Sequence, residues 1–391
     1  MAVYYLMFRV LPAVIAGICS YFYVRRVLVF WRPDVERRRA RLLSGALALV
    51  FALLCSNFWS VRTMVILHLL AVAFLVELAA ALLRLIFRRR GNGKGKGDEG
   101  EDRERCGEEN RLLRAVGILY RCGLLPVLIT AVMLGYGAFN MGRIVRTEYR
   151  VGTEKELDEA YRLVLITDTH YGTIQDKELL REKAEEISGE EPDLVVLAGD
   201  IVEENTSKED MEEVFQVLGG IRSRYGVYYV YGHHDRQPYT ERPTYADSEL
   251  AGAIRKNGIT ILEDGAVELG DDLLLAGRAD AAWGNVSGRA APEGILEGAD
   301  KERFVIMADH QPVETAENAA AGVDLLLSGH THAGQMWPIG VFSELFGTLN
   351  YGEYQEGDCR IIVSSGFTGW GYPFRTEEHC EYVVVELSQE S

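Results

Sequence analysis

A series of short apolar runs in the second half of the chain limits the fold more than any other feature. The runs are rich in β-branched residues, and helical patterns such as Lys177–Ile187 and Lys208–Ile221 lie between several of them. Short strands that alternate with helices predict an α/β domain. The strands that we expect are Leu163–Thr167, Leu194–Ala198, Val227–Tyr231, Leu273–Ala276, Phe304–Met307, Leu325–Ser328, Ile361–Ser364 and Tyr382–Val385.

Five of these strands are followed within two residues by aspartate or histidine, and six of the chain's eight histidines lie near these points. Functional groups of α/β domains gather where strands end. Imidazole together with carboxylate suits Zn, Fe and Mn, whereas Mg and Ca favour oxygen ligands alone. The candidate residues are Asp168, His170, Asp200, His233, His234, Asp235, His310, His330 and His332.

The spacing of these residues also predicts how they bind metal. Asp168 and His170 are two residues apart on an extended chain and therefore face the same way. A carboxylate such as Asp200 can bridge two ions held about 3.5–4 Å apart. Glycines at positions 199, 232 and 329 allow tight turns that bring the ligands close to one point.

The first 142 residues contain long apolar runs instead. Each run is about long enough to cross the roughly 30 Å hydrocarbon core of a bilayer as a helix. We therefore expect an all-α transmembrane region of about four helices, with a charged loop at about 88–112. The four runs are approximately Val3–Val24, Leu42–Trp59, Thr63–Phe87 and Ala115–Phe139.

Residues 143–160 are expected to be a linker, and residues 161–391 to form the α/β domain. Arginine-rich segments at 25–41 and 88–96 predict that both flanking loops are cytoplasmic. Four crossings then place the N-terminus and the α/β domain on the non-cytoplasmic side of the cell membrane. The expectation is a multi-pass protein with an extracytoplasmic domain.

Charge separates the two parts of the chain. Residues 1–150 carry 23 basic and 11 acidic side chains, whereas residues 151–391 carry 18 basic and 47 acidic ones. A phosphate backbone would be repelled by so acidic a domain, so nucleic acid is not expected as a partner. Cys359 and Cys380 are the cysteines of the acidic domain. They could form one disulfide outside the cytoplasm or remain free thiols.

The blocks around the strand ends closely resemble those of the calcineurin-like metallophosphoesterases, especially a bacterial membrane-associated branch. That family's pattern is D-x-H, G-D, G-N-H-[DE], a single H and G-H-x-H, and corresponding blocks occur here in this order between about Tyr161 and Leu387. Residues 329–335 and 369–375 resemble that branch in particular. The resemblance implies a four-layer αββα sandwich with two divalent transition metal ions at one edge.

The resemblance also implies which residues hold each metal. The first ion would be held by Asp168, His170 and His332, with Asp200 as the bridge. The second would be held by His310, His330 and the residue at position 233. The choice among Mn, Fe and Zn stays open. Where the family has asparagine, this chain has His233, which could bind the metal or lie behind the ligands.

His234 and Asp235 complete the implied site. The resemblance implies that His234 protonates the leaving oxygen or stabilises its charge, and that Asp235 orients it. We therefore expect a membrane-anchored phosphoesterase that hydrolyses a phosphomonoester, phosphodiester or pyrophosphate bond. Lipid-linked and cell-envelope phosphates are compounds that such a domain would meet. The alternative is a degenerate metal-binding sensor or binding module on a membrane base, which His233 alone favours.

Overall fold

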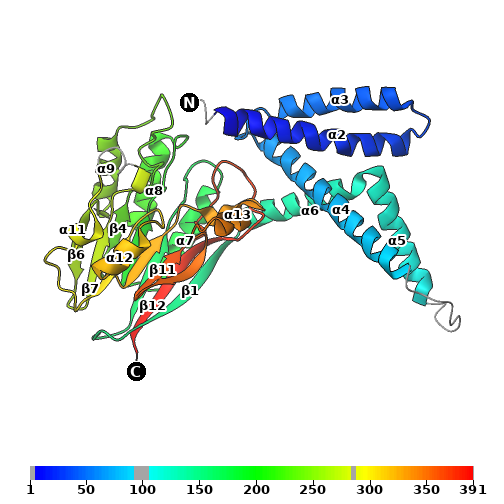
Figure 1. Ribbon diagram of the computed structural model, residues 1–391. Helices are drawn as coiled ribbons and strands as arrows, with labels where there is room; N and C mark the ends of the chain where they lie inside the picture. The colour runs from blue at the N-terminus through cyan, green and yellow to red at the C-terminus, as the bar shows by residue number, and fades with distance from the viewer. Residues whose placement is uncertain (1–4, 92–104, 283–287, 391) are drawn as a thin grey trace. The chain divides into compact units, whose positions relative to one another are not determined.

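The computed structural model describes residues 5–91, 105–282 and 288–390. The chain divides into two compact units, Met1–Gly135 and Tyr136–Ser391 (Figure 1). The first unit is helical over its described residues. Its elements are η1 (Leu6–Val10), α2 (Leu11–Trp31), α3 (Arg37–Leu54), α4 (Val61–Gly91), α5 (Arg105–Cys122) and the start of α6 (Leu124–Met141).

Three helical segments of the described chain are long and apolar enough to cross a membrane: Phe8–Trp31, Val61–Ile86 and Leu124–Met141. The expectation of about four spans was therefore one too high. Helix α3 begins with the charged sequence Arg-Arg-Arg-Ala-Arg and ends at Leu54, which leaves an apolar stretch of only about 20 Å. The run at 115–139 is broken at Gly123, where a φ of +83° separates α5 from α6.

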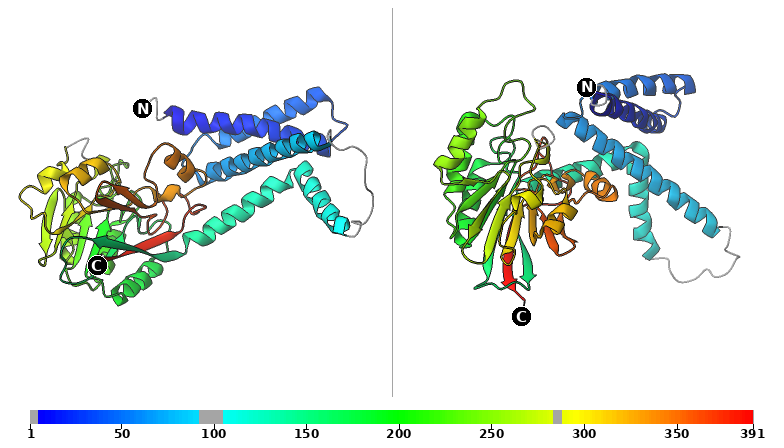
Figure 2. Two further views of the ribbon diagram at one scale, coloured as in Figure 1. Left: turned by 60° about the horizontal axis from the view of Figure 1, so that its bottom comes forward. Right: turned by 60° about the vertical axis from the view of Figure 1, so that its left-hand side comes forward.

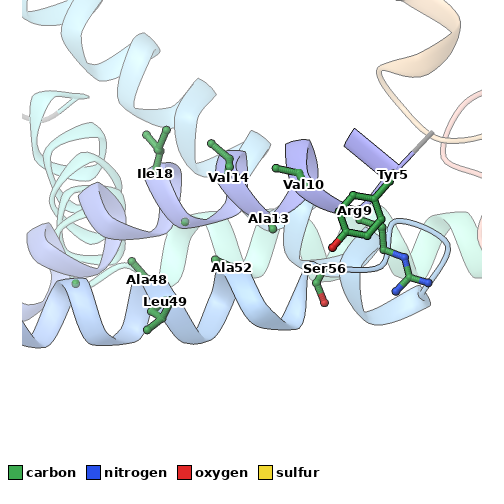
Figure 3. Close-up of a pocket in the computed structure, with 12 residues that line it drawn as sticks. Tyr5, Arg9, Val10, Ala13, Val14, Ile18, Ala48, Leu49, Ala52 and Ser56 are labelled. Atoms are coloured by element: carbon green, nitrogen blue, oxygen red, sulfur yellow. The ribbon is translucent and has the colours of Figure 1, made fainter. Parts of the chain in front are cut away.

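A groove of about 720 Å³ runs between α2 and α3. Small side chains such as Ala13, Gly17 and Ala48 line it, and a Cβ atom on Gly17 would lie 3.3 Å from that of Ala52. Tyr5, Arg9 and Ser56 lie at one end of the groove (Figure 3). The small residues therefore let these two helices approach each other closely.

The second unit contains two six-stranded sheets. The first has the order β1-β12-β2-β3-β4-β5 and the second β10-β11-β9-β8-β7-β6. The strands of the first sheet are β1 (Ile144–Thr153), β12 (Cys380–Gln389), β2 (Tyr161–Ile166), β3 (Leu194–Ala198), β4 (Val227–Val230) and β5 (Thr260–Ile261). Those of the second are β10 (Gly352–Glu356), β11 (Cys359–Val363), β9 (Leu325–Ser328), β8 (Phe304–Ala308), β7 (Leu273–Gly277) and β6 (Gly265–Leu269).

The two sheets pack face to face, with helices on their outer faces. One buried apolar cluster joins Leu165 of β2 to Ile306 of β8 and therefore lies between the sheets. Helices α7 (Lys177–Gly189), α8 (Lys208–Gly219) and α9 (Asp247–Lys256) pack on the other face of the first sheet. Helices α11 (Pro292–Ile295) and α12 (Thr315–Ala321) cover the second. This arrangement confirms the expected four-layer αββα sandwich.

The segment 143–160, which we expected to be a linker, contains strand β1. This strand pairs in parallel with β12 along its whole length, from Ile144 opposite Cys380 to Thr153 opposite Gln389 (Figure 2 shows the two strands side by side). Ile144 and Val151 point to opposite faces of the strand and are buried in the two cores that flank the sheet. Cys359 and Cys380 are both buried and are free thiols.

The central strands of both sheets are parallel, and this brings the predicted site residues together. Ile166 of β2 lies opposite Leu197 of β3, and Ala308 of β8 lies opposite Leu327 of β9. Parallel strands in register end at the same edge. The segments that follow β2, β3, β4, β8 and β9 therefore meet at one end of the sandwich.

Candidate metal centre

Two groups of side chains at this edge could each hold a metal ion. The first is Asp168, His170 and His332, and the second is Asp200, His233, His310 and His330. Within each group the candidate ligand atoms all lie within 4.8 Å of one another. The structure thus brings together all seven residues that were expected to bind metal. It also divides them into the sets that the resemblance implied.

In the first group, the Nε2 atoms of His170 and His332 are 3.3 Å apart. Nε2 of His332 lies 3.5 Å from Oδ1 of Asp168. The loops after β2 and β9 are joined here, because the His330 amide donates to Oδ2 of Asp168 at 3.0 Å. These contacts direct one carboxylate oxygen and two ring nitrogens toward a common point.

The second group is arranged around Asp200. Its Oδ2 atom lies 3.0 Å from Nε2 of His310 and 3.1 Å from Nδ1 of His233. The two imidazole nitrogens are 3.3 Å apart. The ring centroid of His330 is 4.7 Å from that of His233. His233 therefore belongs to the second group of candidate ligands.

The backbone of the site is held in an unusual conformation. Asp168, His170, Asp200, His330 and His332 all have positive φ angles, between 38° and 73°. Left-handed backbone is uncommon for residues other than glycine and is found most often at functional sites. Hydrogen bonds between neighbouring loops fix this conformation, including those from the Asp168 amide to the Gly199 carbonyl and from the His170 amide to the Asp200 carbonyl.

Two of the glycines are required because neighbouring groups approach too closely for a side chain. A Cβ atom on Gly232 would lie 2.2 Å from Oδ1 of Asp200. One on Gly329 would lie 2.4 Å from Oδ2 of Asp168. Any larger residue would displace a candidate ligand, so both positions serve the metal centre and not merely a turn.

The chemistry of the buried atoms fits a bound cation. Among the described residues, the buried atoms without a hydrogen-bond partner include Oδ1 of Asp168, Oδ2 of Asp200 and Nδ1 of His330. Leaving such atoms unpaired is costly unless another group satisfies them. Carboxylate oxygens and ring nitrogens crowd together here at 3.0–3.5 Å. A cation between them would satisfy all of these atoms.

Burial and neighbouring charges shift the pKa values of several candidate ligands. Burial lowers the pKa of His170 and His330 well below the usual range and that of His332 to about 3. These imidazoles are therefore neutral, the form that binds metal. Burial would raise the pKa of Asp200, but the imidazoles of His310 and His233 outweigh it and hold that pKa well below its usual value. Asp200 is consequently an anion.

His234 lies beside the two groups. Its ring centroid is 5.5 Å from that of His170 and 4.1 Å from that of His233. Nδ1 of His234 is 2.7 Å from Oε2 of Glu204. Burial acts to lower the pKa of His234, but the contact with Glu204 and the charge of Asp200 outweigh burial and raise it. This shift favours the protonated form of an imidazole that lies next to the candidate metal ligands.

Asp235 does not contact the ring of His234 as we expected. Its buried carboxylate accepts hydrogen bonds from the amides of Asp200, Ile201, Val202 and Gly232, at 2.6–3.1 Å. The sharp turn after β4 directs Asp235 inward, whereas His234 faces the edge of the sandwich. Asp235 therefore fixes the loop that carries Asp200, and Glu204 takes the place beside the imidazole.

Sequence reasoning missed the role of Glu204 and the neighbours of His234. The Trp370 ring lies 5.0 Å from that of His234 and donates through Nε1 to Oε2 of Glu203 at 2.8 Å. Tyr239 is 63% exposed, with its ring 5.3 Å from that of His234. The sequence held one signal for the acid: Glu203 and Glu204 come only three and four residues after Asp200.

Comparison with known proteins agrees with this geometry. A family model described as calcineurin-like phosphoesterase matches residues 161–334. An uncharacterized metallophosphoesterase of Helicobacter pylori J99 is 31% identical over 236 residues, which are 59% of this chain and 61% of that protein. A transmembrane protein with metallophosphoesterase domain from Danio rerio is 27% identical over 288 residues, 69% of this chain and 63% of that protein.

The match to both relatives therefore spans less than two thirds of their length. Among solved structures, the protein TT1561 of Thermus thermophilus aligns with a TM-score of 0.37 and 14% identity, over 53% of this chain and 90% of that one. That agreement is too low to add to the description of the fold. The match over residues 161–334 identifies a calcineurin-like phosphoesterase domain in the second unit, and the relatives that match are named as metallophosphoesterases.

Proposed function

We propose that the protein is a membrane-anchored, dinuclear-metal phosphoesterase that hydrolyses a phosphomonoester, phosphodiester or pyrophosphate bond. One observation carries the proposal. The buried Asp200 carboxylate contacts His233 and His310 of one ligand group, while its backbone carbonyl accepts from the amide of His170 in the other. Two candidate metal groups joined at one aspartate suit a phosphoryl displacement, in which charge develops on both the attacking and the leaving oxygen.

Asp168, His170 and His332 would hold one divalent ion, and His233, His310 and His330 the other, with Asp200 between them. Mn, Fe and Zn are the metals that this mixture of imidazole and carboxylate favours. When bound, the two ions would supply Lewis-acid stabilisation of the phosphoryl oxygens and a nucleophile derived from water.

His234 is proposed as the general acid. The raised pKa favours its protonated form, and a proton on the nitrogen that Glu204 does not contact would be given to the leaving oxygen. Glu204 holds the ring in place through Nδ1. Tyr239, exposed beside His234, lies where it could contact the leaving group.

The helical unit is proposed to anchor the domain in the cell membrane as a multi-pass region, with the catalytic domain outside the cytoplasm. The basic segment 88–96 follows the apolar part of α4, which favours a cytoplasmic position for that end of the helix. After this segment, α6 is the one described helix that is long and apolar enough to cross. A single crossing from the cytoplasm leads to the opposite side. The orientation therefore rests on the segment 88–96, because with three spans the arginine-rich segments 25–41 and 88–96 lie on opposite sides of the membrane and only one of them is cytoplasmic.

The substrate class is tested by a metal-supplemented screen of the full-length protein. Soluble aryl phosphate monoesters, aryl phosphate diesters and a pyrophosphate are compared with a phosphorylated lipid in vesicles, each with Mn, Fe or Zn. We expect metal-dependent hydrolysis of at least one class, and its loss in His234→Ala with metal content unchanged. A protein that binds metal but hydrolyses none of these compounds would contradict the proposal and favour a sensor.

A further inference from the structure

The exposed large apolar side chains of the second unit are concentrated in two short segments. Within the described part of Tyr136–Ser391, all of them except Tyr239 and Val313 lie in residues 136–139 or 339–346. Phe342 is 53% exposed and Phe346 is 82% exposed. Contiguous apolar surface of this kind marks contact with another molecule or with a membrane.

The second segment contains helix α13 (Ile339–Leu345). Among its residues only Gly340 is buried, and Glu344 is the one charged side chain. A surface helix normally turns its apolar side chains toward its own domain. In α13, the side chains of Val341, Phe342 and Leu345 point outward instead, so its own domain does not cover its apolar surface.

One loop holds both exposed segments. The side chain of Asn140, at the end of α6, donates to the carbonyls of Arg375, Glu377 and Glu378 at 3.1–3.3 Å. The Arg375 amide donates to the carbonyl of Gly137 at 3.0 Å. From the same loop, the Glu377 carboxylate accepts from the amide of Gly340 in α13 at 2.8 Å.

The connection between α13 and the end of α6 indicates what covers the apolar surface of α13. Helix α6 is long and apolar enough to cross a membrane, and Tyr136 and Phe139 are exposed on its last turns. Aromatic side chains at the end of a span lie at the level of the lipid headgroups. Since α13 and the end of α6 are bound to the same loop, the apolar surface of α13 lies where that span would leave the bilayer.

We propose that α13 is a membrane-docking helix that inserts Phe342, Leu345 and Phe346 into the bilayer interface. The proposal rests on the proposed membrane anchoring through α6. Because Glu344 is the only charge on the helix, insertion depends on apolar burial and not on anionic lipid.

Docking of α13 in the bilayer interface also indicates which class of substrate the metal centre would meet. Arg375, which is buried, donates from Nη1 to the His332 carbonyl at 3.0 Å and from Nη2 to the Thr368 carbonyl at 2.7 Å. The Thr368 carbonyl also lies 3.1 Å from Nδ1 of His332. The loop that binds α6 and α13 thus fixes a candidate metal ligand. The docked domain would present its metal centre to phosphate esters of lipid headgroups.

The test measures the depth of single side chains in the full-length protein, reconstituted in phosphatidylcholine vesicles. A cysteine is introduced at Phe346, Val132 or Val313 and labelled with an environment-sensitive fluorophore. The parent chain with its own cysteines is labelled in parallel as the blank. Quenching by lipids that carry a spin label on the acyl chain reports insertion. Val132 lies on α6 and is 73% exposed, whereas Val313 is an exposed apolar residue that belongs to neither segment.

We expect the labels at Phe346→Cys and Val132→Cys to lose most of their fluorescence to the lipid quencher, and the label at Val313→Cys to lose none. Quenching at Val132 without quenching at Phe346 would overturn the docking proposal while leaving the anchor intact. The proposal would also be overturned if the label at Phe346→Cys escaped the lipid quencher and was buried only in contact with a soluble protein or with a second copy of the chain. Absence of quenching at Val132 would instead refute the membrane anchoring.

Discussion

Nδ1 of His234 lies 2.7 Å from Oε2 of Glu204, and the two side chains come from the loops that follow β4 and β3. The contact fixes the orientation of the imidazole next to the candidate metal ligands. It also raises the pKa of His234 against the effect of burial. Glu204 contacts His234 but belongs to neither group of candidate metal ligands, so it is a positioning residue. Its removal should change the catalytic rate and leave the metal content unchanged.

Replacing Glu204 by alanine is expected to lower kcat for a soluble aryl phosphate ester by about 10-fold or more, because the acid is no longer held in place. Glu204→Gln keeps a hydrogen-bond acceptor and should recover part of the rate. Metal content should stay unchanged in both variants. Glu212→Ala, which removes an exposed glutamate on α8, is the control. Wild-type kcat in Glu204→Ala would show that the contact has no catalytic role.

Asp235→Asn is expected to act through stability. The carboxylate accepts four buried backbone hydrogen bonds, and the amide can replace only part of them. Hydrogen bonds to a charged acceptor contribute about 1.5–3 kcal/mol each, so the melting temperature should fall by several degrees. Loss of activity at an unchanged melting temperature would instead return Asp235 to a direct role with His234.

The two ligand groups predict separable metal losses. His332→Ala should remove one ion and His310→Ala the other, so that elemental analysis falls from about two ions per chain to about one in each variant. Asp200→Ala should lose both. His379→Ala, at a partly buried histidine that belongs to neither group, is the matched control. If His332→Ala and His310→Ala both retained two ions per chain, the assignment would be wrong.

His233→Asn separately tests the residue that departs from the family pattern. Nδ1 of His233 lies 3.1 Å from Oδ2 of Asp200, so we expect the change to alter which metal binds best, because an amide oxygen is a harder ligand than imidazole. The measurement is the ratio of Mn to Zn bound from an equimolar mixture. An unchanged ratio and an unchanged rate would argue against ligation by His233.

Glu381 predicts a pH-dependent contribution to stability. Burial would raise its pKa, but contacts with His379 and Thr147 and the amide of Ser365 outweigh burial and lower it. A lowered folded pKa stabilises the fold above the unfolded value of about 4.3, and this stabilisation is lost as pH falls through the folded pKa. Wild type should therefore melt at a higher temperature than Glu381→Gln at pH 7, and the difference should shrink near pH 4. An equal difference at both pH values would refute the charge effect.

The proposed orientation predicts the accessibility of introduced cysteines. Lys256 on α9 and Arg114 on α5 are both exposed. An impermeant maleimide added to intact cells should label Lys256→Cys, whereas Arg114→Cys should react only after permeabilisation. The parent chain provides the blank for native cysteines. The opposite labelling pattern would place the catalytic domain in the cytoplasm.

The strand pattern of the sequence predicted an α/β domain and the seven residues that the two ligand groups contain, and the resemblance to a known family implied the four-layer sandwich. This was possible because Asp168, Asp200 and His310 follow apolar strands, and parallel strands end at one edge whatever the details of their loops. Its apolar runs also indicated the helical unit. Their count was one too high because the apolar run at 42–59 does not show that the helix beginning at the charged residues 37–41 ends at Leu54.

Tertiary structure alone decided the features that depend on loop direction and on distant partners. Asp235 and Glu204 are both acids near His234, and only the turn after β4 determines that Asp235 faces backbone amides while Glu204 faces the imidazole. Strand β1 exists because β12, more than 200 residues later, pairs with it. The exposure of Phe346 likewise depends on where the 375–378 loop holds α13. Such choices come from hydrogen bonds between segments far apart in the chain, which local sequence patterns do not encode.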